Sequence, residues 1–245
     1  MTARKEFREL ATREYWDKYY SAAKESNKKG HEWFRTYEQL RPFFARNLFN
    51  REGLQVQDNP MILHPGSGES DIPLWLAKEG YKRQLCFDFS KEVVETMTDV
   101  INAMVKANEI EGIEYQKMDA FNMEGIPDKS IDVAFDKGMM DSLIDGDPWN
   151  PPPEVRRDTR NYQKELHRVL KDDGVFLYIT FRQPHFVEPL LIPRDQEVLW
   201  DLQKEALIDN AASLGYFAWI VRKKGAPIRP LVEVFSEEKP EGQDP

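Results

Sequence analysis

The residues with the clearest potential for chemistry are two glycines and a carboxylate that follow apolar runs. Gly66 and Gly68 come directly after the apolar run 61–64, and Asp88 stands twenty residues after Gly68, at the end of the next apolar run. Glycine at such a turn lets the backbone approach a ligand closely, and an acidic side chain on the following strand can accept both hydroxyls of a ribose. The spacing therefore predicts a nucleotide-binding site.

Two further carboxylates, Asp119 and Asp136, also stand at the ends of apolar runs. In an open parallel sheet, ligands bind beyond the carboxyl ends of the strands, and a buried carboxylate is costly without a partner. Each aspartate alone has a simpler explanation as a helix cap or a turn residue. As a set with Asp88, they favour a ligand site along one edge of the sheet.

The residues after the glycines narrow the choice of ligand. A Gly-x-x-x-x-Gly-Lys-Ser/Thr phosphate loop is absent, and Glu69 and Asp71 stand where a pyrophosphate would be repelled. An acidic start to the next helix suits a cationic or zwitterionic ligand, such as the sulfonium nucleoside S-adenosylmethionine. Trp and Tyr side chains near the N-terminus would add cation–π attraction to such a ligand.

The elements that must position these residues alternate along the chain. The hydrophobic patterns predict strands at 61–64, 84–87, 113–117, 131–135 and 175–181, and helices at 72–78, 91–108 and 153–170. Alternating strands and helices indicate a mainly parallel sheet. We therefore expect an α/β fold, with a seven-stranded, Rossmann-like, mainly parallel sheet in a single domain over residues 1–235.

The two ends of the chain are expected to add to this sheet. Residues 1–50 predict a helical cap rich in aromatic side chains, which either pack on the domain or close over a ligand. Residues 195–213 predict a helix, and 216–222 with 231–235 an antiparallel hairpin at the sheet edge. Residues 236–245 predict a disordered acidic tail.

Composition limits the classes of function. The chain has 245 residues, 40% of them hydrophobic and 31% charged, with a net charge of -9. The negative charge argues against a nucleic-acid partner and permits a basic protein partner. No apolar run approaches the roughly 18 residues that span a membrane. The single cysteine, Cys86, predicts a buried thiol and a reducing, cytoplasmic location.

Several segments resemble a known family. They are Tyr15 to Tyr20 with Trp33-Phe34, the glycine loop Leu63 to Ser70, Phe87-Asp88-Phe89-Ser90, Asp136-Lys137-Gly138-Met139-Met140-Asp141-Ser142-Leu143, and Pro184-His185-Phe186. Over about residues 15–190 the chain resembles class I S-adenosylmethionine-dependent methyltransferases, and within them the branch that methylates lysines of translation elongation factor 1-alpha. His64 and Pro65 at the mouth of the glycine loop, Glu69, and Met139-Met140 depart from the pattern of that branch.

The resemblance implies S-adenosyl-L-methionine as cofactor, S-adenosyl-L-homocysteine as product, and a protein acceptor, possibly a translation elongation factor. Trp16, Tyr20 and Trp33 would close over the cofactor, and Gly66 and Gly68 would pass under its methionine moiety. Asp88 would hold the ribose, and Phe89 would lie beside the adenine. Asp119 and Ala120 would face the adenine edge. The methionyl end would lie near Asp136 and Lys137.

Methyl transfer to a lysine needs a neutral amine, so a nearby proton acceptor is useful. Asp136, Asp141 and His185 are the candidates, although each could instead be structural; no metal is expected. Two alternatives to a protein-lysine methyltransferase stay open. One is a small-molecule O-, S- or N-methyltransferase, which Met139-Met140 and the aromatic cap would suit. The other is a non-catalytic partner module that retains the cofactor fold.

Overall fold

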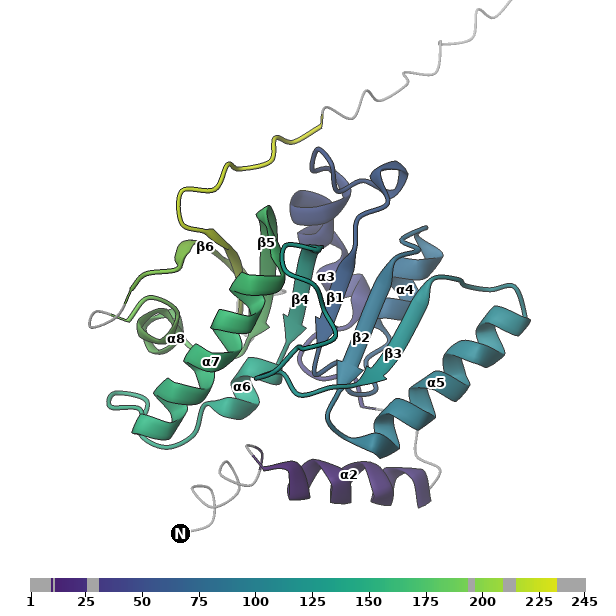
Figure 1. The fold of residues 1–245 in the computed structure, drawn as a ribbon, viewed down its shortest axis with the longest axis horizontal. Coiled ribbons are helices and arrows are strands. Elements are labelled where there is room, and N and C mark those ends of the chain that lie inside the picture. The colour runs from purple at the N-terminus through teal and green to yellow at the C-terminus, as the bar shows by residue number, and fades with distance from the viewer. Residues whose placement is uncertain (1–9, 11, 26–30, 194–196, 209–214, 233–245) are drawn as a thin grey trace, which may run out of the picture.

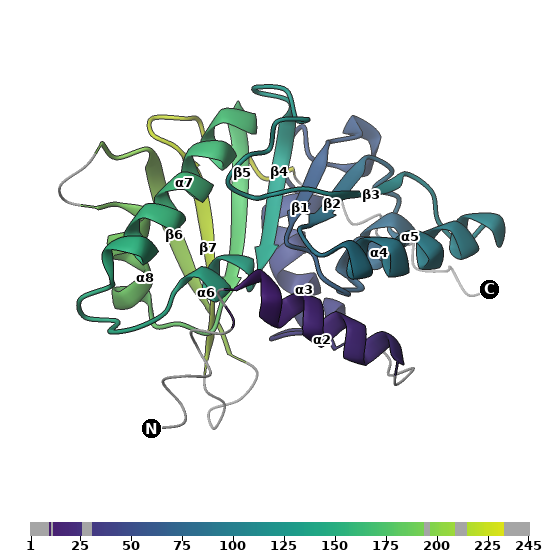
Figure 2. The same cartoon turned by 60° about the horizontal axis from the view of Figure 1, so that its bottom comes forward.

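A seven-stranded sheet forms the centre of the protein, with helices on both faces (Figures 1 and 2). The computed structural model describes residues 10, 12–25, 31–193, 197–208 and 215–232. The strands are β1 (Ile62–Pro65), β2 (Gln84–Asp88), β3 (Ile113–Lys117), β4 (Ile131–Lys137), β5 (Leu170–Thr180), β6 (Trp200–Leu207) and β7 (Tyr216–Lys223). The predicted α/β fold is confirmed.

The order of the strands is β3-β2-β1-β4-β5-β7-β6. The strands β1 to β5 are parallel, and β7 pairs antiparallel with both β5 and β6. Chain order reverses between β1 and β4, and a crevice for ligands is expected at such a switch point, beyond the carboxyl ends of the strands.

Helices and shorter turns connect the strands. They are α2 (Arg13–Glu25), α3 (Tyr37–Phe44), the π-helical turn η1 (Ala45–Phe49), the 3-10 turn η2 (Val56–Asp58), α4 (Ile72–Lys78), α5 (Lys91–Lys106), α6 (Met139–Leu143), α7 (Pro153–Val169) and α8 (Pro184–Leu191). Among the described residues, no helix is long and apolar enough to cross a lipid bilayer.

The core lies on both faces of the sheet because side chains alternate along each buried strand. On β5, Phe176 and Tyr178 face a cluster with α7 and α8, whereas Val175, Leu177 and Ile179 face a cluster with α3 and α4. A third cluster joins α5 and α2 and includes Cys86, which is fully buried as predicted.

The N-terminal aromatic residues divide between two places. Tyr37, Phe43 and Phe44 of α3 are buried in the core on one face of the sheet. Helix α2, in contrast, lies across the ends of the strands, at the bottom of Figure 1. The packing interpretation is therefore confirmed for α3, whereas closure of the α2 rings over a ligand stays a prediction.

The predicted helix 195–213 is wrong for its described part, because Trp200–Leu207 is the strand β6. This stretch contains Leu, Gln, Lys, Glu and Ala, which favour helices locally, but pairing along the whole of β7 overrides that preference. The antiparallel C-terminal hairpin is confirmed with β6 and β7 as its strands.

The second strand expected for that hairpin is 231–235, and its described residues, Leu231 and Val232, are not part of the sheet. Leu231 makes only an isolated bridge to Arg51, and Val232 N donates to Asn50 O at 2.8 Å. Pro227 and Pro230 lack the N–H that a strand partner would need. Residues 233–235 and the predicted acidic tail 236–245 lie outside the described residues.

Candidate active site

A cavity of about 510 Å³ lies beyond the carboxyl ends of β1, β2, β3 and β4, under α2. Every residue predicted to bind the cofactor except Asp136 lines it: Trp16, Tyr20, Trp33, Gly66, Gly68, Asp88, Phe89, Asp119, Ala120 and Lys137. The fold thus brings together residues from six separate segments. Their individual roles remain predictions.

The glycine loop forms the floor of the cavity. Gly66 and Gly68 have φ of 53° and 54°, in the left-handed region that favours glycine. A β-carbon at Gly66 would overlap the Met139 side chain, and one at Gly68 would lie 2.7 Å from the Tyr20 hydroxyl oxygen. The Tyr115 hydroxyl donates a hydrogen bond to Gly68 O. Only glycine permits this close approach of the loop to its neighbours.

Asp88, at the end of β2, holds this loop in place. Its Oδ2 accepts a hydrogen bond from Gly68 N at 3.1 Å and its Oδ1 accepts one from Ser90 N at 3.0 Å. Burial raises the pKa of Asp88 to about 6, against the lowering effect of these hydrogen bonds. A hydrogen bond from the Phe89 backbone also lowers the pKa of Asp88. A carboxylate has about four acceptor positions, so acceptor capacity remains for a ribose hydroxyl in the cavity.

Aromatic rings form the roof. Trp16 and Tyr20 of α2 stack with ring centroids 5.8 Å apart, and Trp16 packs edge-on against Trp33 at 6.0 Å. The indole Nε1 of Trp16 donates to Leu10 O at 2.7 Å. Electron-rich ring faces beside the cavity suit a sulfonium cation, so roof and floor both fit S-adenosylmethionine.

One ion pair ties the roof segment to the sheet. Lys137, the last residue of β4, forms a salt bridge with Glu32 and donates to Trp33 O at 2.7 Å. Glu32 also accepts from Ser70 Oγ at 2.9 Å and from Asp71 N at 2.8 Å. Burial raises the pKa of Glu32 to about 6 and lowers the pKa of Lys137. The Glu32–Lys137 pair therefore joins roof, glycine loop and β4.

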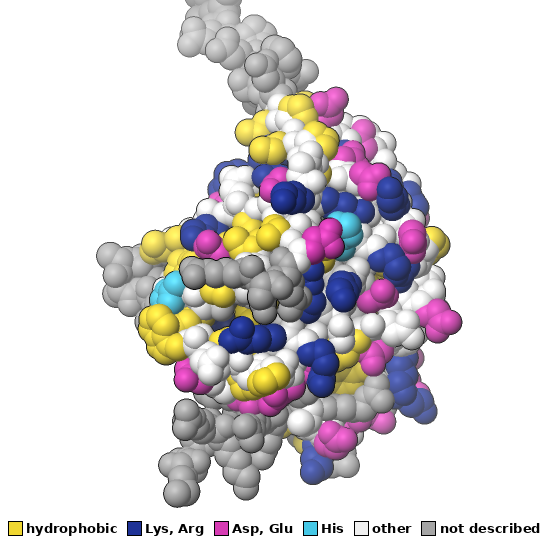
Figure 3. Space-filling model, turned by 60° about the vertical axis from the view of Figure 1, so that its left-hand side comes forward, with side chains coloured by type: hydrophobic (Ala, Val, Ile, Leu, Met, Phe, Trp, Pro, Cys, Tyr) yellow, Lys and Arg dark blue, Asp and Glu magenta, His cyan; other side chains and the backbone are white. Residues whose placement is uncertain are grey.

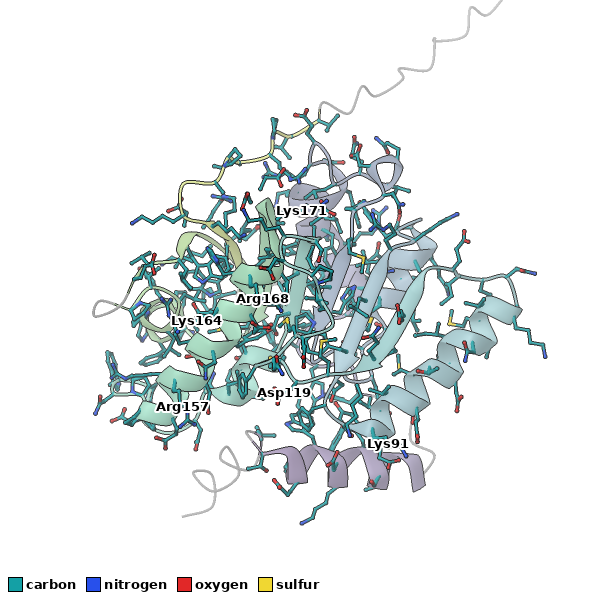
Figure 4. All side chains as sticks on the ribbon, viewed as in Figure 1. Lys91, Asp119, Arg157, Lys164, Arg168 and Lys171 are labelled. Carbon is teal, nitrogen blue, oxygen red and sulfur yellow. The ribbon has the colours of Figure 1, made fainter. Side chains whose placement is uncertain are left out.

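Asp119 lies at the open side of the site. Its side chain is exposed, and Oδ1 accepts from Phe121 N at 2.9 Å. Figure 4 shows it beyond the end of β3 and near α6. Ala120 next to it is buried and contributes an apolar wall.

Asp136 does not line the cavity, so its predicted place at the cofactor and as a base is corrected. The carboxylate is buried behind α6, where it accepts from Met139 N at 2.8 Å, Met140 N at 3.0 Å and Tyr162 Oη at 2.9 Å. Neighbouring residues of a strand point to opposite faces, so Asp136 faces α7 while Lys137 faces the roof. Asp136 therefore holds the first turn of α6 in place.

Burial raises the pKa of Asp136 to about 7. A carboxyl with a folded pKa above its unfolded value stabilises the fold at low pH, and this stability is lost as pH rises from about 4 through about 7. We expect Asp136→Asn to remove this dependence. Relative to the wild type, the variant should gain on the order of 3 kcal/mol between pH 4 and pH 8.

Urea unfolding at several pH values measures this difference. Asp99→Asn, the same change at an exposed site on α5, should give a curve parallel to that of the wild type. A parallel curve for Asp136→Asn would contradict the burial argument.

Asp141 lines the cavity, but each of its carboxylate oxygens already accepts a hydrogen bond, and Arg182 forms an ion pair with it. Its carboxylate accepts from Tyr178 Oη at 2.7 Å and Thr180 Oγ1 at 2.7 Å, and the Nε of Arg182 lies 3.4 Å away. Burial raises the pKa of Asp141 to about 6. Because its acceptor positions are largely occupied, the geometry favours a role in positioning Arg182 over a role as a base.

The expectations for two histidines are also corrected. His185 is exposed in the first turn of α8, where it packs against Phe186, and it does not line the cavity. His64 is not at the mouth of the glycine loop but buried between strands, with Nε2 2.9 Å from Gln84 Oε1. Burial lowers the pKa of His64 to about 4, so it is a neutral core residue.

Sequence reasoning missed several residues of the site. Phe181 and Arg182 follow β5 and line the cavity; the strand-end rule, applied to the fifth strand as well, would have found them. Phe34 has a φ of 64° and places its ring 5.4 Å from that of Phe181. Neither this backbone conformation nor the pairing of Glu32 with Lys137 leaves a signal in the sequence.

Comparison with known proteins defines the class. Residues 63–178 match the family model described as "Methyltransferase domain". The structure is similar to that of a SAM-dependent methyltransferase from Methanosarcina mazei, with a TM-score of 0.54, 17% identity and coverage of 78% of this chain and 98% of that one. Residues 63–178 therefore match a methyltransferase domain, and the fold is that of a SAM-dependent methyltransferase, as the sequence predicted.

Within this class the chain is similar to curated proteins that methylate a translation factor. It is 26% identical over 242 residues to an "eEF1A lysine and N-terminal methyltransferase homolog" of Drosophila melanogaster, covering 94% of this chain and 33% of that protein. It is 27% identical over 175 residues to "EEF1A lysine methyltransferase 4" of Mus musculus, covering 71% and 62%. The chain thus spans between one third and two thirds of these relatives.

Proposed function

We propose that this protein transfers a methyl group from S-adenosylmethionine to a lysine side chain of a protein. The observation that carries the proposal is the joint placement of Asp88, the glycine loop and the aromatic roof around one cavity. Bound S-adenosylmethionine would supply an electrophilic methyl group. The names of the relatives support a lysine acceptor, with translation factor eEF1A as the first candidate and the cytoplasm as the place of encounter.

The part of the cavity beyond the predicted cofactor residues would receive the acceptor. Its walls include Phe34, Met139, Leu143 and Phe181, which are apolar. Removing an ammonium group from water disfavours its charged form, so these walls would help present the neutral amine that methyl transfer needs. Holding that amine in line with the methyl group, with water excluded, supplies the main rate advantage. In this proposal the roof over the cavity is the lid that excludes water.

The same apolar walls favour the second candidate, a methyltransferase for small molecules. The fold does not decide between the two, since a cyclase named SpnF shares it with a TM-score of 0.54, 15% identity and coverage of 82% of this chain and 84% of that one. The nature of the acceptor must therefore come from a measurement of the product.

Incubation with tritiated S-adenosylmethionine and dialysed cell lysate tests the acceptor class. We expect a labelled protein band in which mass spectrometry finds methyl-lysine. The Asp88→Ala variant should leave the band unlabelled. Label confined to compounds of low mass would overturn the proposal in favour of the second candidate. Absence of cofactor binding by calorimetry would indicate a partner module without catalysis.

A further inference from the structure

Exposed aromatic side chains concentrate around the cavity. Among the described residues, the large hydrophobic side chains with high exposure include three aromatic ones: Phe121 at 37%, Phe181 at 41% and Trp149 at 78%. Phe121 and Phe181 line the cavity, whereas Trp149 lies on the loop between α6 and α7. An exposed aromatic group of this kind is typical of a surface that binds a partner.

Trp149 forms a compact patch with the start of α8. Its ring centroid lies 5.5 Å from that of His185 and 4.9 Å from that of Phe186. We name these three residues the Trp149 patch. Figure 3 shows the side of the molecule that carries α8, where hydrophobic side chains and a histidine gather at one edge and charged side chains are interspersed elsewhere.

The loop that presents Trp149 is held in place. Asp147 Oδ1 accepts from Trp149 N at 2.9 Å, and Arg156 donates to Pro151 O and to Asn150 Oδ1, both at 3.0 Å. Gly146, at φ 86°, lies against the Pro152 ring. A surface that is already ordered loses little conformational entropy on binding.

The patch is built from two segments, the loop that carries Trp149 and the start of α8, and both follow directly after residues that line the cavity. The loop leaves α6 at Leu143, and α8 begins two residues after Arg182; Leu143 and Arg182 both line the cavity. Arg182 also links these two segments, because its Nη2 donates to Asp141 O at 3.2 Å and to Ile144 O. The patch therefore adjoins the side of the cavity that would receive the acceptor.

The charge of the loop indicates which partner fits. Asp145 and Asp147 lie within four residues of Trp149, and Asp147 has no ion pair within the described part of the chain. The net charge of the protein is -9. An indole face is the best aromatic partner for a cation, and a nearby carboxylate strengthens that preference. Together they suit a Lys or Arg side chain.

We propose that the Trp149 patch docks a basic segment of the protein acceptor, with a Lys or Arg side chain over Trp149 while the target lysine enters the cavity. This inference rests on the proposed function and adds the chemistry of the residues that flank the methylated lysine. A small-molecule acceptor would have no use for the patch, since it would lie wholly inside the cavity.

Methylation kinetics with the labelled acceptor protein, purified from the lysate, test the proposal. Trp149→Ala should raise the KM for the acceptor about 5- to 20-fold, with kcat within about twofold of the wild type. Trp149→Phe, which keeps a weaker aromatic face, should have an intermediate KM. Ile228→Ala, another exposed apolar residue and one outside the cavity, serves as the control and should match the wild type.

Calorimetry with S-adenosylmethionine distinguishes a loss of acceptor docking from damage to the cofactor site. All these variants should bind S-adenosylmethionine with the affinity of the wild type. An unchanged KM for the acceptor in Trp149→Ala would overturn the proposed docking surface and leave the proposed function intact. A lower affinity of Trp149→Ala for S-adenosylmethionine would have the same meaning. If the wild type labels no protein, the proposed function fails and the docking surface fails with it.

Discussion

Replacing Asp88 by Ala is expected to lower the affinity for S-adenosylmethionine by about 100-fold or more. The carboxylate keeps acceptor capacity for a ribose hydroxyl, and a hydrogen bond to a charged group contributes roughly 1.5–3 kcal/mol. The substitution also removes the acceptors for Gly68 N and Ser90 N, so the glycine loop loses one of its hydrogen bonds to β2 and keeps the one from Ser67 N to Phe87 O. Isothermal titration calorimetry measures the loss directly.

Asp99→Ala is the matched control, because it removes the same charge from an exposed position on α5. It should leave the affinity unchanged. Thermal unfolding of Asp88→Ala should show one cooperative transition, which demonstrates that the variant still folds. An affinity for Asp88→Ala within about threefold of the wild type would mean that the ribose lies elsewhere in the cavity.

Breaking the Glu32–Lys137 pair is expected to cause the largest loss of stability. Lys137→Ala leaves the buried carboxylate of Glu32 without its cation, and removal of one partner of a buried pair costs about 3–5 kcal/mol. It also removes the hydrogen bond from Lys137 to Trp33 O and so loosens the roof. We expect a lower free energy of unfolding at pH 8 in urea, and weaker cofactor binding where the variant remains folded.

The matched control is Lys129→Ala, which breaks the exposed pair with Asp172 and should cost less than about 1 kcal/mol. The double variant Glu32→Gln with Lys137→Met removes both charges and should recover most of the stability lost by Lys137→Ala. At pH 5 the penalty for Lys137→Ala should shrink, because Glu32 is protonated there. Equal stability of Lys137→Ala and the wild type would contradict a buried pair.

Much of the cavity could be predicted because its backbone has strict local requirements. Gly66, Gly68 and Asp88 follow from where apolar runs end and from how closely a turn must approach a ligand. Strand ends alone do not say to which face a side chain points. For that reason the strand-end rule places Asp136 at the ligand, although only its neighbour Lys137, which the family resemblance adds, reaches the cavity.

Other features depend on contacts that no local pattern encodes. The stretch Trp200–Leu207 is rich in helix formers and becomes a strand because β7 offers it a continuous partner. Glu32 is one acidic residue among many until the fold brings it to Lys137, which lies 105 positions away in the chain. The motif Pro184-His185-Phe186 was found, but its exposure next to Trp149 was visible only in the structure.

The same separation of 105 residues has a consequence for the order in which the protein forms during synthesis. The roof residues leave the ribosome before β4, and their anchor on that strand, Lys137, follows Glu32 by 105 positions. Contacts between distant positions form late, because closing a long loop costs entropy before it gains stability. The Glu32–Lys137 pair, which ties the roof to the sheet, therefore forms only when β4 joins the sheet, after β1 and β2 have supplied the glycine loop and Asp88.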